Sequence, residues 1–234
     1  MNARELFDAG QLGAAIEALS ADLRNAPTDT ARRTFLFELL CFAGLYDRAE
    51  KHLDLLADGG QQAAMGALLY RSALHAARAR RTLFASGGWP GGTVPDVQGT
   101  LNGRPFTSLR DADPRIGARL ELFAAGQYTW IPFAQVELVR VPAPSRLRDL
   151  LWAPGQVKTA PDFQGLELGE VLLPVLGPFT EDDEDDAVRL GRASAWVRDE
   201  AGTEFPVGQK LWLVDGEEMP LLDVRELIIT GRSG

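Results

Sequence analysis

Cysteine and histidine are almost absent from this sequence of 234 residues, which contains Cys41, His52 and His75 and no others of either type. A single cysteine cannot form an internal disulfide, and a reduced thiol fits a cytoplasmic location. The two histidines stand in different predicted helices, so no histidine- or cysteine-based zinc site can be assembled. We therefore expect no metal and no cofactor.

Long apolar segments and secretory signals are also missing. The apolar run at 171–176 is far shorter than the roughly 20 residues that a membrane-spanning helix needs. The first ten residues carry charges at Arg4, Glu5 and Asp8 with no apolar run behind them, so we expect no secretory signal. We expect no membrane partner.

The motifs of the common enzyme classes are absent as well. The sequence has no G-x-S-x-G elbow, no phosphate-binding G-x-x-x-x-G-K-[ST] loop, no G-x-G-x-x-G turn and no H-E-x-x-H helix. We therefore predict that the protein is not an enzyme and has no catalytic residue. One alternative stays open, a carboxylate-dependent hydrolase with its site in a cleft between the two halves of the chain. The acids that could approach one another in space are Asp111, Asp113, Glu121 and Glu137.

Basic residues are too few to balance the acidic ones. The chain has 24 Lys+Arg against 33 Asp+Glu, a net charge of -9, which repels nucleic-acid phosphates. Residues 1–85 hold ten of each sign, so the whole excess of negative charge follows them. The acidic run at 181–186 lacks the spacing of a calcium loop and is predicted to be a solvated loop that precedes a short helix near 187–191.

Proline and tryptophan are scarce in the first part of the chain and common in the second. All five tryptophans and thirteen of the fourteen prolines follow residue 88. This change predicts an α+β protein: a helical domain at 1–85, a Gly- and Pro-rich connector at 86–100 that no helix or regular strand crosses, and a small, mostly antiparallel β domain with short helices at 101–234.

The first part shows apolar residues at helical spacing, which predicts helices at 11–25, 29–43, 46–57 and 61–84. Gly10 and Gly44 stand where the chain must reverse, and they are 34 residues apart. The same offset relates Ala15 to Ala49 and Leu19 to Leu53, and 34 residues is the tetratricopeptide period. We therefore predict a tetratricopeptide-like domain, with a plain antiparallel helical bundle as the alternative.

The second part has shorter, alternating patterns typical of strands. A hairpin is predicted for 119–125 and 127–133 around Gly126, and a strand or short helix for 135–141. Further strands are expected at 166–176 and 209–214, with Asp215 and Gly216 as a tight turn. Together these segments predict an antiparallel sheet.

Five phrases of the second part resemble the ImpE/TagJ (SciE) family. They are DADPRIG at 111–117, GQYTWIPF at 126–133, LRDLLWAP at 147–154, RLGR at 189–192 followed by Trp196, and PLLDVR at 220–225. The resemblance implies an adaptor or accessory protein of the bacterial type VI secretion apparatus, with the contractile sheath subunit and the ClpV disassembly ATPase as protein partners. It brings no catalytic residues.

A protein that acts by binding needs a contact surface, and two are predicted. The helical part is expected to form a concave groove for an amphipathic helix of a sheath subunit. The β domain supplies aromatic and arginine residues of the types enriched at binding hot spots. The alternatives are that these side chains form the core, or that the protein is a structural scaffold of an oligomer whose state the sequence does not set. The predicted partner-binding residues are Leu36, Tyr46, Trp130, Phe133, Trp152, Arg189, Arg192 and Trp196, with Leu40 and Leu53 expected in the core.

Overall fold

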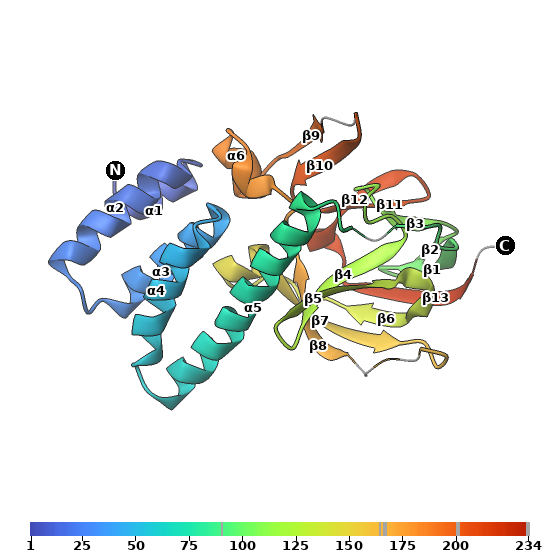
Figure 1. Ribbon diagram of the computed structural model, residues 1–234, viewed down its shortest axis with the longest axis horizontal. Coiled ribbons are helices and arrows are strands. Elements are labelled where there is room, and N and C mark those ends of the chain that lie inside the picture. The colour runs from blue at the N-terminus through green and yellow to red at the C-terminus, as the bar shows by residue number, and fades with distance from the viewer. Residues whose placement is uncertain (90, 164, 166–167, 200–201, 233–234) are drawn as a thin grey trace.

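The computed structural model describes residues 1–89, 91–163, 165, 168–199 and 202–232. Helices lie at one end of the molecule and strands at the other, with the longest helix between them (Figure 1). The helices of the first part are α1 (Ala3–Asp8), α2 (Leu12–Asn25), α3 (Thr30–Phe42), α4 (Tyr46–Ala57) and α5 (Gln61–Ala85). The predicted α+β fold class is therefore confirmed, with helices first and an antiparallel β part after them.

The four predicted helices correspond to α2–α5, and α1 is an addition. Helix α1 is only six residues long, too short to show a periodic pattern, and a capping box holds its start. In this box the Asn2 side chain accepts a hydrogen bond from the N–H of Glu5, and the Glu5 side chain accepts one from the N–H of Asn2. Helix α3 is capped by Asp29, whose side chain accepts a hydrogen bond from Arg32 N.

The 34-residue offset corresponds to two helical hairpins with the same turn. Gly10 and Gly44 both have positive φ, +79° and +66°, which a glycine adopts without strain. Each glycine N–H donates to the carbonyl three residues earlier, and the next N–H donates to the carbonyl five residues earlier. These bonds satisfy the last carbonyls of α1 and α3 in the same way. The repeat therefore records a real structural repeat, α1–α2 followed by α3–α4.

The residues that the 34-residue offset matches are buried in both hairpins. Ala15 and Ala49 are completely buried, and Leu19 and Leu53 beside them are each 3% exposed. A side chain of one carbon allows close approach of two helices, and leucine fills the space next to it. Ala15 and Ala49 are thus buried to the same extent at matched positions of α2 and α4, and so are Leu19 and Leu53.

The second part forms three antiparallel sheets. The largest has the strand order β2-β1-β13-β6-β7-β8-β4-β5, and two small sheets are β10-β9 and β12-β11-β3. The C-terminal strand β13 lies between β1 and β6, so the two ends of this part are paired in one sheet. The strands are β1 (Val97–Leu101), β2 (Arg104–Phe106), β3 (Leu109–Asp111), β4 (Arg119–Ala124), β5 (Gln127–Pro132), β6 (Val136–Arg140), β7 (Trp152–Thr159), β8 (Gly169–Pro174), β9 (Ser194–Arg198), β10 (Glu204–Gly208), β11 (Leu211–Val214), β12 (Glu217–Pro220) and β13 (Glu226–Arg232).

The predicted hairpin around Gly126 is present as β4 and β5, with Glu121 opposite Trp130 in the register. Asp215 and Gly216 connect β11 to β12 as a tight turn, both with positive φ. The strand expected at 166–176 is β8, and residues 166 and 167 lie outside the described part of the chain. The predicted helix near 187–191 is α6 (Asp186–Arg189).

The prediction that no strand crosses the connector at 86–100 is wrong at its C-terminal end. Strand β1 begins at Val97 and pairs with β13 from its first residue. Gly99 is needed there, since an added Cβ would lie 1.9 Å from the carbonyl oxygen of Ile228. A short strand that contains glycine and follows two prolines lacks a recognisable local pattern, and its pairing partner lies at the far end of the chain.

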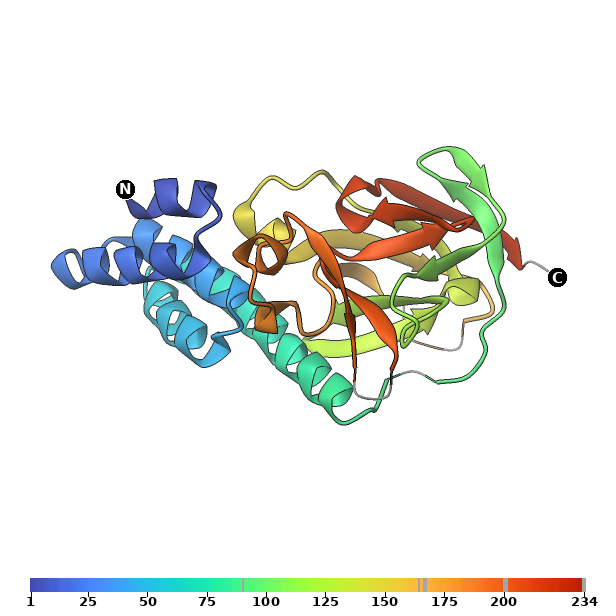
Figure 2. The same cartoon turned by 90° about the horizontal axis from the view of Figure 1, so that it is seen from above.

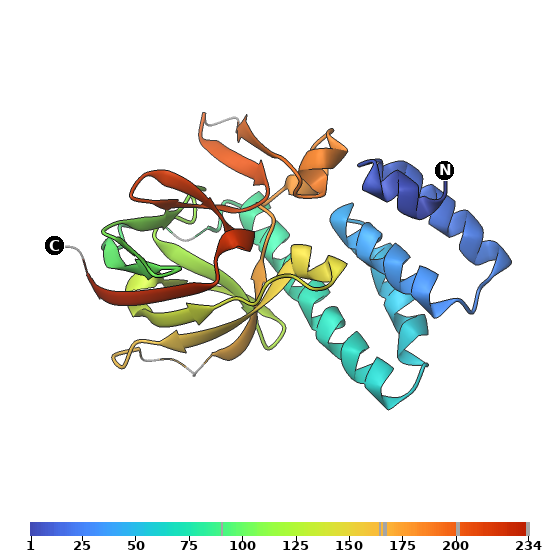
Figure 3. The same cartoon turned by 180° about the vertical axis from the view of Figure 1, so that it is seen from behind.

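The helical and β parts share one hydrophobic core. Phe123, Leu151, Trp152 and Leu190 from the second part belong to the same buried cluster as the helices. The short helical turn η2 (Leu147–Leu150) lies between α3 and the sheet, as seen from behind (Figure 3). From above, the chain termini lie at opposite ends of the molecule (Figure 2). In the described part of the chain, no helix has the length and apolar character needed to cross a membrane.

Candidate functional site

Helix α5 joins the two parts of the molecule. Its second half packs along β5, where His75 Nδ1 donates a hydrogen bond of 3.0 Å to the carbonyl of Gly126. Further along, the rings of Phe84 and Tyr128 lie 6.4 Å apart. The first half of α5 extends past the β4–β5 turn (Figure 1). The position of this helix therefore decides the shape of the surface between the two parts.

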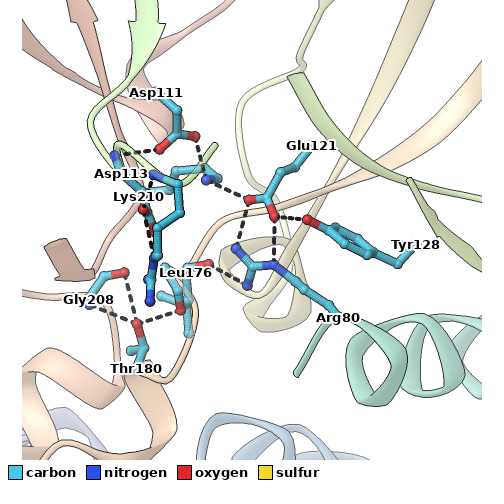
Figure 4. A network of polar contacts seen from close by, with 11 residues as sticks. Arg80, Asp111, Asp113, Glu121, Tyr128, Leu176, Thr180, Gly208 and Lys210 are labelled. Atoms are coloured by element: carbon cyan, nitrogen blue, oxygen red, sulfur yellow. Dashed lines mark hydrogen bonds and ion pairs between the residues drawn. The ribbon is translucent and has the colours of Figure 1, made fainter. Parts of the chain in front are cut away.

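Four charged side chains fix α5 against the β part in a buried network (Figure 4). Arg80 donates from Nε and Nη2 to the carboxylate of Glu121 in β4, at 3.0 and 2.7 Å. Lys210 Nζ lies 2.6 Å from Glu121 and 2.5 Å from Asp111 in β3. Two cations thus face two anions, in side chains that are at most 10% exposed. Because the charges balance, they are tolerated inside the protein.

The surroundings shift the pKa values of the two carboxyl groups in opposite directions. Burial alone would raise the pKa of Glu121, but Arg80 and Lys210 outweigh burial and hold this pKa well below its ordinary value. For Asp111 burial is the stronger influence and raises the pKa to about 6, against the attraction of Lys210. The hydroxyl of Tyr128 donates to Glu121 at 2.5 Å. At neutral pH both carboxylates are therefore anions that face cations.

The acids considered for a hydrolase do not form an open site. Besides the two carboxylates of the network, Asp113 pairs with Arg115 at 2.7 Å, with side chains 0 and 4% exposed. Glu137 lies apart in β6 and pairs with Lys158 at 2.6 Å. Each of the four acids thus has a basic partner. Among the described residues, no three His, Cys, Asp or Glu side chains are placed to share a metal ion.

An open groove of about 740 Å³ lies between α5 and the outer face of the eight-stranded sheet. One wall is α5, with Leu69, Ser72 and Ala73. The floor includes Pro154 of β7 and Leu172 of β8, and the β4–β5 turn closes one end. A concave surface of this size with apolar lining is the usual form of a binding site.

The strand register divides the sheet side of the groove into two rows. Leu172 pairs with Pro154 on one side and with Phe123 on the other, so these three apolar side chains share one face in a row. Trp152 precedes Pro154 by two residues on β7, so both side chains lie on the same face of the sheet. The ring of Trp152 stacks on that of Tyr70 in α5, with the centroids 6.3 Å apart. The apolar row therefore lies on the side of the groove that faces α5.

A polar row bounds the groove on the side away from α5. Glu226 pairs with Arg140, Arg140 with Gln156, and Gln156 with Glu170, in register across β13, β6, β7 and β8. All four line the groove. The groove thus has an apolar floor, an apolar helix as one wall and a polar rim as the other.

The apolar surface continues from the groove onto the exposed side of α5. Met65, Leu68 and Leu69 are 68, 60 and 49% exposed, and Leu69 also lines the groove. Residues 61–70 carry no charge. A cluster of large exposed apolar side chains beside a groove is typical of a surface that another protein covers.

The predicted groove on the helical part is not open. Leu36 is 1% exposed and Leu40 is fully buried, because α3 packs against its neighbours on the face that carries both. Tyr46 is half-buried, packs against the same core, and has its pKa raised by burial. The prediction that Leu36 lines a groove is therefore wrong for this structure. The open apolar surface lies on the other side of α5.

Two of the four aromatic residues of the β part that were predicted to bind partners are buried in the core. Phe133 is fully buried with its ring edge on Trp212, at 5.3 Å between centroids, and Trp152 is 6% exposed. The prediction that Phe133 and Trp152 contact a partner is therefore wrong for this structure, because their large rings fill the space between the sheets and α5. Trp130 is half-buried, with its ring 5.6 Å from that of Tyr128. Trp196 in β9 is 51% exposed and remains a predicted contact residue.

The two predicted arginines of the α6 segment make contacts within the chain. Arg192 donates to the carbonyls of Phe7 and Asp8 at 2.8 and 3.0 Å, at the end of α1. Its guanidinium also lies 4.6 Å from the centre of the Phe7 ring. Arg189 is half-buried and pairs with Asp186 at 2.9 Å. A partner role for either residue stays a prediction.

Arg192→Ala is expected to lower the free energy of unfolding by about 1 kcal/mol, because two carbonyls at the negative end of α1 lose a charged donor. Amide exchange in α1 should accelerate more than elsewhere. Thermal unfolding with hydrogen exchange measures both effects, and Arg198→Ala in the neighbouring exposed pair with Glu204 is the control. Unchanged exchange in α1 would show that this contact does not hold the helix.

Sequence reasoning missed the groove because its lining comes from segments far apart in the chain, and the three lining residues that lie in the quoted phrases, Gly126, Pro154 and Arg225, carry no sign of a shared surface. One signal was available. In α5 the buried residues Ala67 and Leu74 and the exposed residues Leu68 and Leu69 are all apolar, so the helix is apolar on more than one face. Such a helix needs either a second packing partner in its own chain or one from another protein.

Comparison with known proteins places these features in a family. The family model described as ImpE protein matches residues 103–228, more than half of the chain. The type VI secretion system accessory component TagJ of Pseudomonas aeruginosa is 32% identical over an alignment of 262 positions, gaps included, that spans 97% of this chain and 90% of that protein. The crystal structure of protein VPA1032 from Vibrio parahaemolyticus has the same fold, with a TM-score of 0.83 at 24% identity over 97% of each chain.

Proposed function

The chain belongs to the ImpE family, and with this as the premise we propose that it is a non-catalytic accessory component of a type VI secretion system that works by binding other proteins. The support from the similar proteins is the name of the TagJ relative. The support from the structure is the apolar groove beside α5, whose lining has the character of a protein-binding surface.

The strands of the groove floor favour a helix as the bound element. Each of β4, β8, β7 and β6 has a paired strand on both sides, so the floor offers no free edge for an added strand. A segment that enters an apolar groove must satisfy its own backbone hydrogen bonds, and a helix does so. An amphipathic helix can also pack its apolar side against α5.

We assign this helix to a subunit of the contractile sheath and propose that a ClpV-type disassembly ATPase binds elsewhere on the molecule. The β9–β10 hairpin, which carries the exposed Trp196, is the second surface. It projects at the top of the molecule in Figure 1, whereas the β4–β5 turn beside the groove lies on the lower side. Two separate surfaces allow one adaptor to hold both partners at the same time.

Titration of the full-length protein with a peptide of the N-terminal helix of the sheath subunit tests the proposal. Saturable binding in the micromolar range is expected, together with amide protection in α5 and β8. Trp196→Ala should leave this titration unchanged and reduce capture of the ATPase. The absence of binding at high micromolar peptide would contradict the assignment of the groove to a sheath helix.

A further inference from the structure

The polar rim of the groove has charges of opposite sign at its two ends. Glu170 of β8 is exposed, and in the described part of the chain it makes no ion pair. At the other end Arg140 pairs with Glu226 at 2.9 Å, which nearly cancels both charges. Gln156, between the ends, is neutral.

Arg225 adds a net positive charge at the β13 end. Its Nη1 donates to the carbonyls of Leu222 and Val224, both at 2.7 Å, so backbone atoms hold the guanidinium in place and no described carboxylate neutralises it. Arg225 is exposed and lines the groove. One rim therefore runs from an unpaired anion at β8 to an unpaired cation at β13, while the opposite wall, α5, is uncharged over residues 61–70.

We propose that the groove recognises an amphipathic helix with a basic and an acidic residue on one polar edge, about three helical turns apart, and no charge on the edge facing α5. This inference rests on the proposed function and specifies the chemistry of the partner. The basic residue faces Glu170 and the acidic residue faces Arg225, so the charges select the partner and fix its position along the groove.

The spacing follows from the geometry of the sheet. From β8 to β13 there are three strand intervals, by way of β7 and β6. At about 4.8 Å for each interval the two ends of the rim are about 14 Å apart. A helix rises about 1.5 Å for each residue, and positions on one edge recur about every seven or eleven residues, that is about 10 or 16 Å apart, so a separation of about eleven residues, three turns, lies nearest to this distance. A shorter helix of one or two turns would reach only one of the two charges.

Four designed peptides of about 18 residues test the inference, each with the same apolar stripe and each titrated into the full-length protein. The mixed peptide carries Lys and Glu three turns apart on one edge, and the others carry two Lys, two Glu or two Gln at the same positions. The mixed peptide should bind about threefold more tightly than the Gln peptide and than either single-sign peptide, in which one attraction is offset by one repulsion, and salt should reduce this advantage.

Substitutions at the two ends of the rim should change the order of affinities. Glu170→Lys should favour the two-Glu peptide and Arg225→Glu the two-Lys peptide, while the double variant should again prefer the mixed peptide, bound in the opposite direction. Glu217→Lys in β12, an exposed position that does not line the groove, is the control and should leave the order unchanged.

The two proposals fail in different ways. If all four peptides bind equally well and none of the substitutions changes their order, the groove binds helices but the charge rule is wrong. If none of the peptides binds, including the Gln peptide, the groove is not a helix-binding site, and the proposed function fails together with the inference.

Discussion

Glu121→Gln is expected to lower the free energy of unfolding by about 3–5 kcal/mol, because it removes one of two anions from a buried network that holds two cations. Lys210 would keep the carboxylate of Asp111, whereas Arg80 would lose its carboxylate partner and remain as an uncompensated positive charge inside the protein. For a chain of this length the melting temperature should fall by about 10 °C. Thermal and urea unfolding measure the loss directly.

Two comparisons separate the effect of charge from that of a changed side chain. Glu137→Gln removes an exposed partner of Lys158 and should cost less than about 0.5 kcal/mol. The double variant Arg80→Met with Glu121→Leu leaves the balanced pair of Lys210 and Asp111, and it should recover more than half of the loss. A loss below about 1 kcal/mol for Glu121→Gln would show that the network is not needed for stability.

The pH dependence of this effect has a definite sign. The pKa of Glu121 is lowered in the folded state from its ordinary value of 4.5, so ionisation of this group stabilises the fold above that pH. The contribution is lost as the pH falls, because protonation then costs the folded state more than the unfolded one. The difference in stability between the wild type and Glu121→Gln should therefore shrink in acid.

Leu69→Asp is expected to weaken binding of a helical peptide by at least about 30-fold, because Leu69 lines the groove and also belongs to the exposed apolar side of α5. A bound apolar helix would have to cover a carboxylate that has no partner there. Since Leu69 is 49% exposed in the free protein, the free energy of unfolding should change by less than about 1 kcal/mol. Calorimetric titration and thermal unfolding of the same sample test both parts.

Leu55→Asp is the matched control for this variant. Leu55 is a leucine of α4 with a similar exposure of 55%, and it does not line the groove. It should change neither binding nor stability by much. If Leu69→Asp and Leu55→Asp bind the peptide equally well, the bound helix lies outside the groove.

The helical part could be predicted from the sequence because its signals are local. Gly10 and Gly44 mark turns that only a residue tolerant of positive φ forms without strain, and the helices between them follow from apolar spacing. The β4–β5 hairpin is local in the same sense, since its strands are joined by the turn at Gly126. Strand β1 was missed because its partner β13 comes from the end of the chain.

Contact residues were harder to predict than elements. The residue types of Phe133 and Trp152 indicate that both side chains are shielded from water. They do not indicate whether the protein's own core or a partner shields them, because both favour aromatic side chains. Only the packing shows that α5 and the sheets cover both, while Trp196 in the β9–β10 hairpin stays exposed. The same limit applies to Arg192, whose partners in α1 lie 184 and 185 positions away.

The sequence by itself determined the α+β class, the helices α2 to α5 with their 34-residue offset, the β4–β5 hairpin and the resemblance to a family, because these depend on neighbours along the chain and on the order of short motifs. Tertiary structure alone decided the site. Arg80 meets Glu121 across 41 positions and Lys210 meets Asp111 across 99, and these contacts set α5 against the sheet. The groove exists because this position of α5 leaves one side of the helix uncovered next to the sheet. No local sequence pattern encodes the distance between α5 and the sheet.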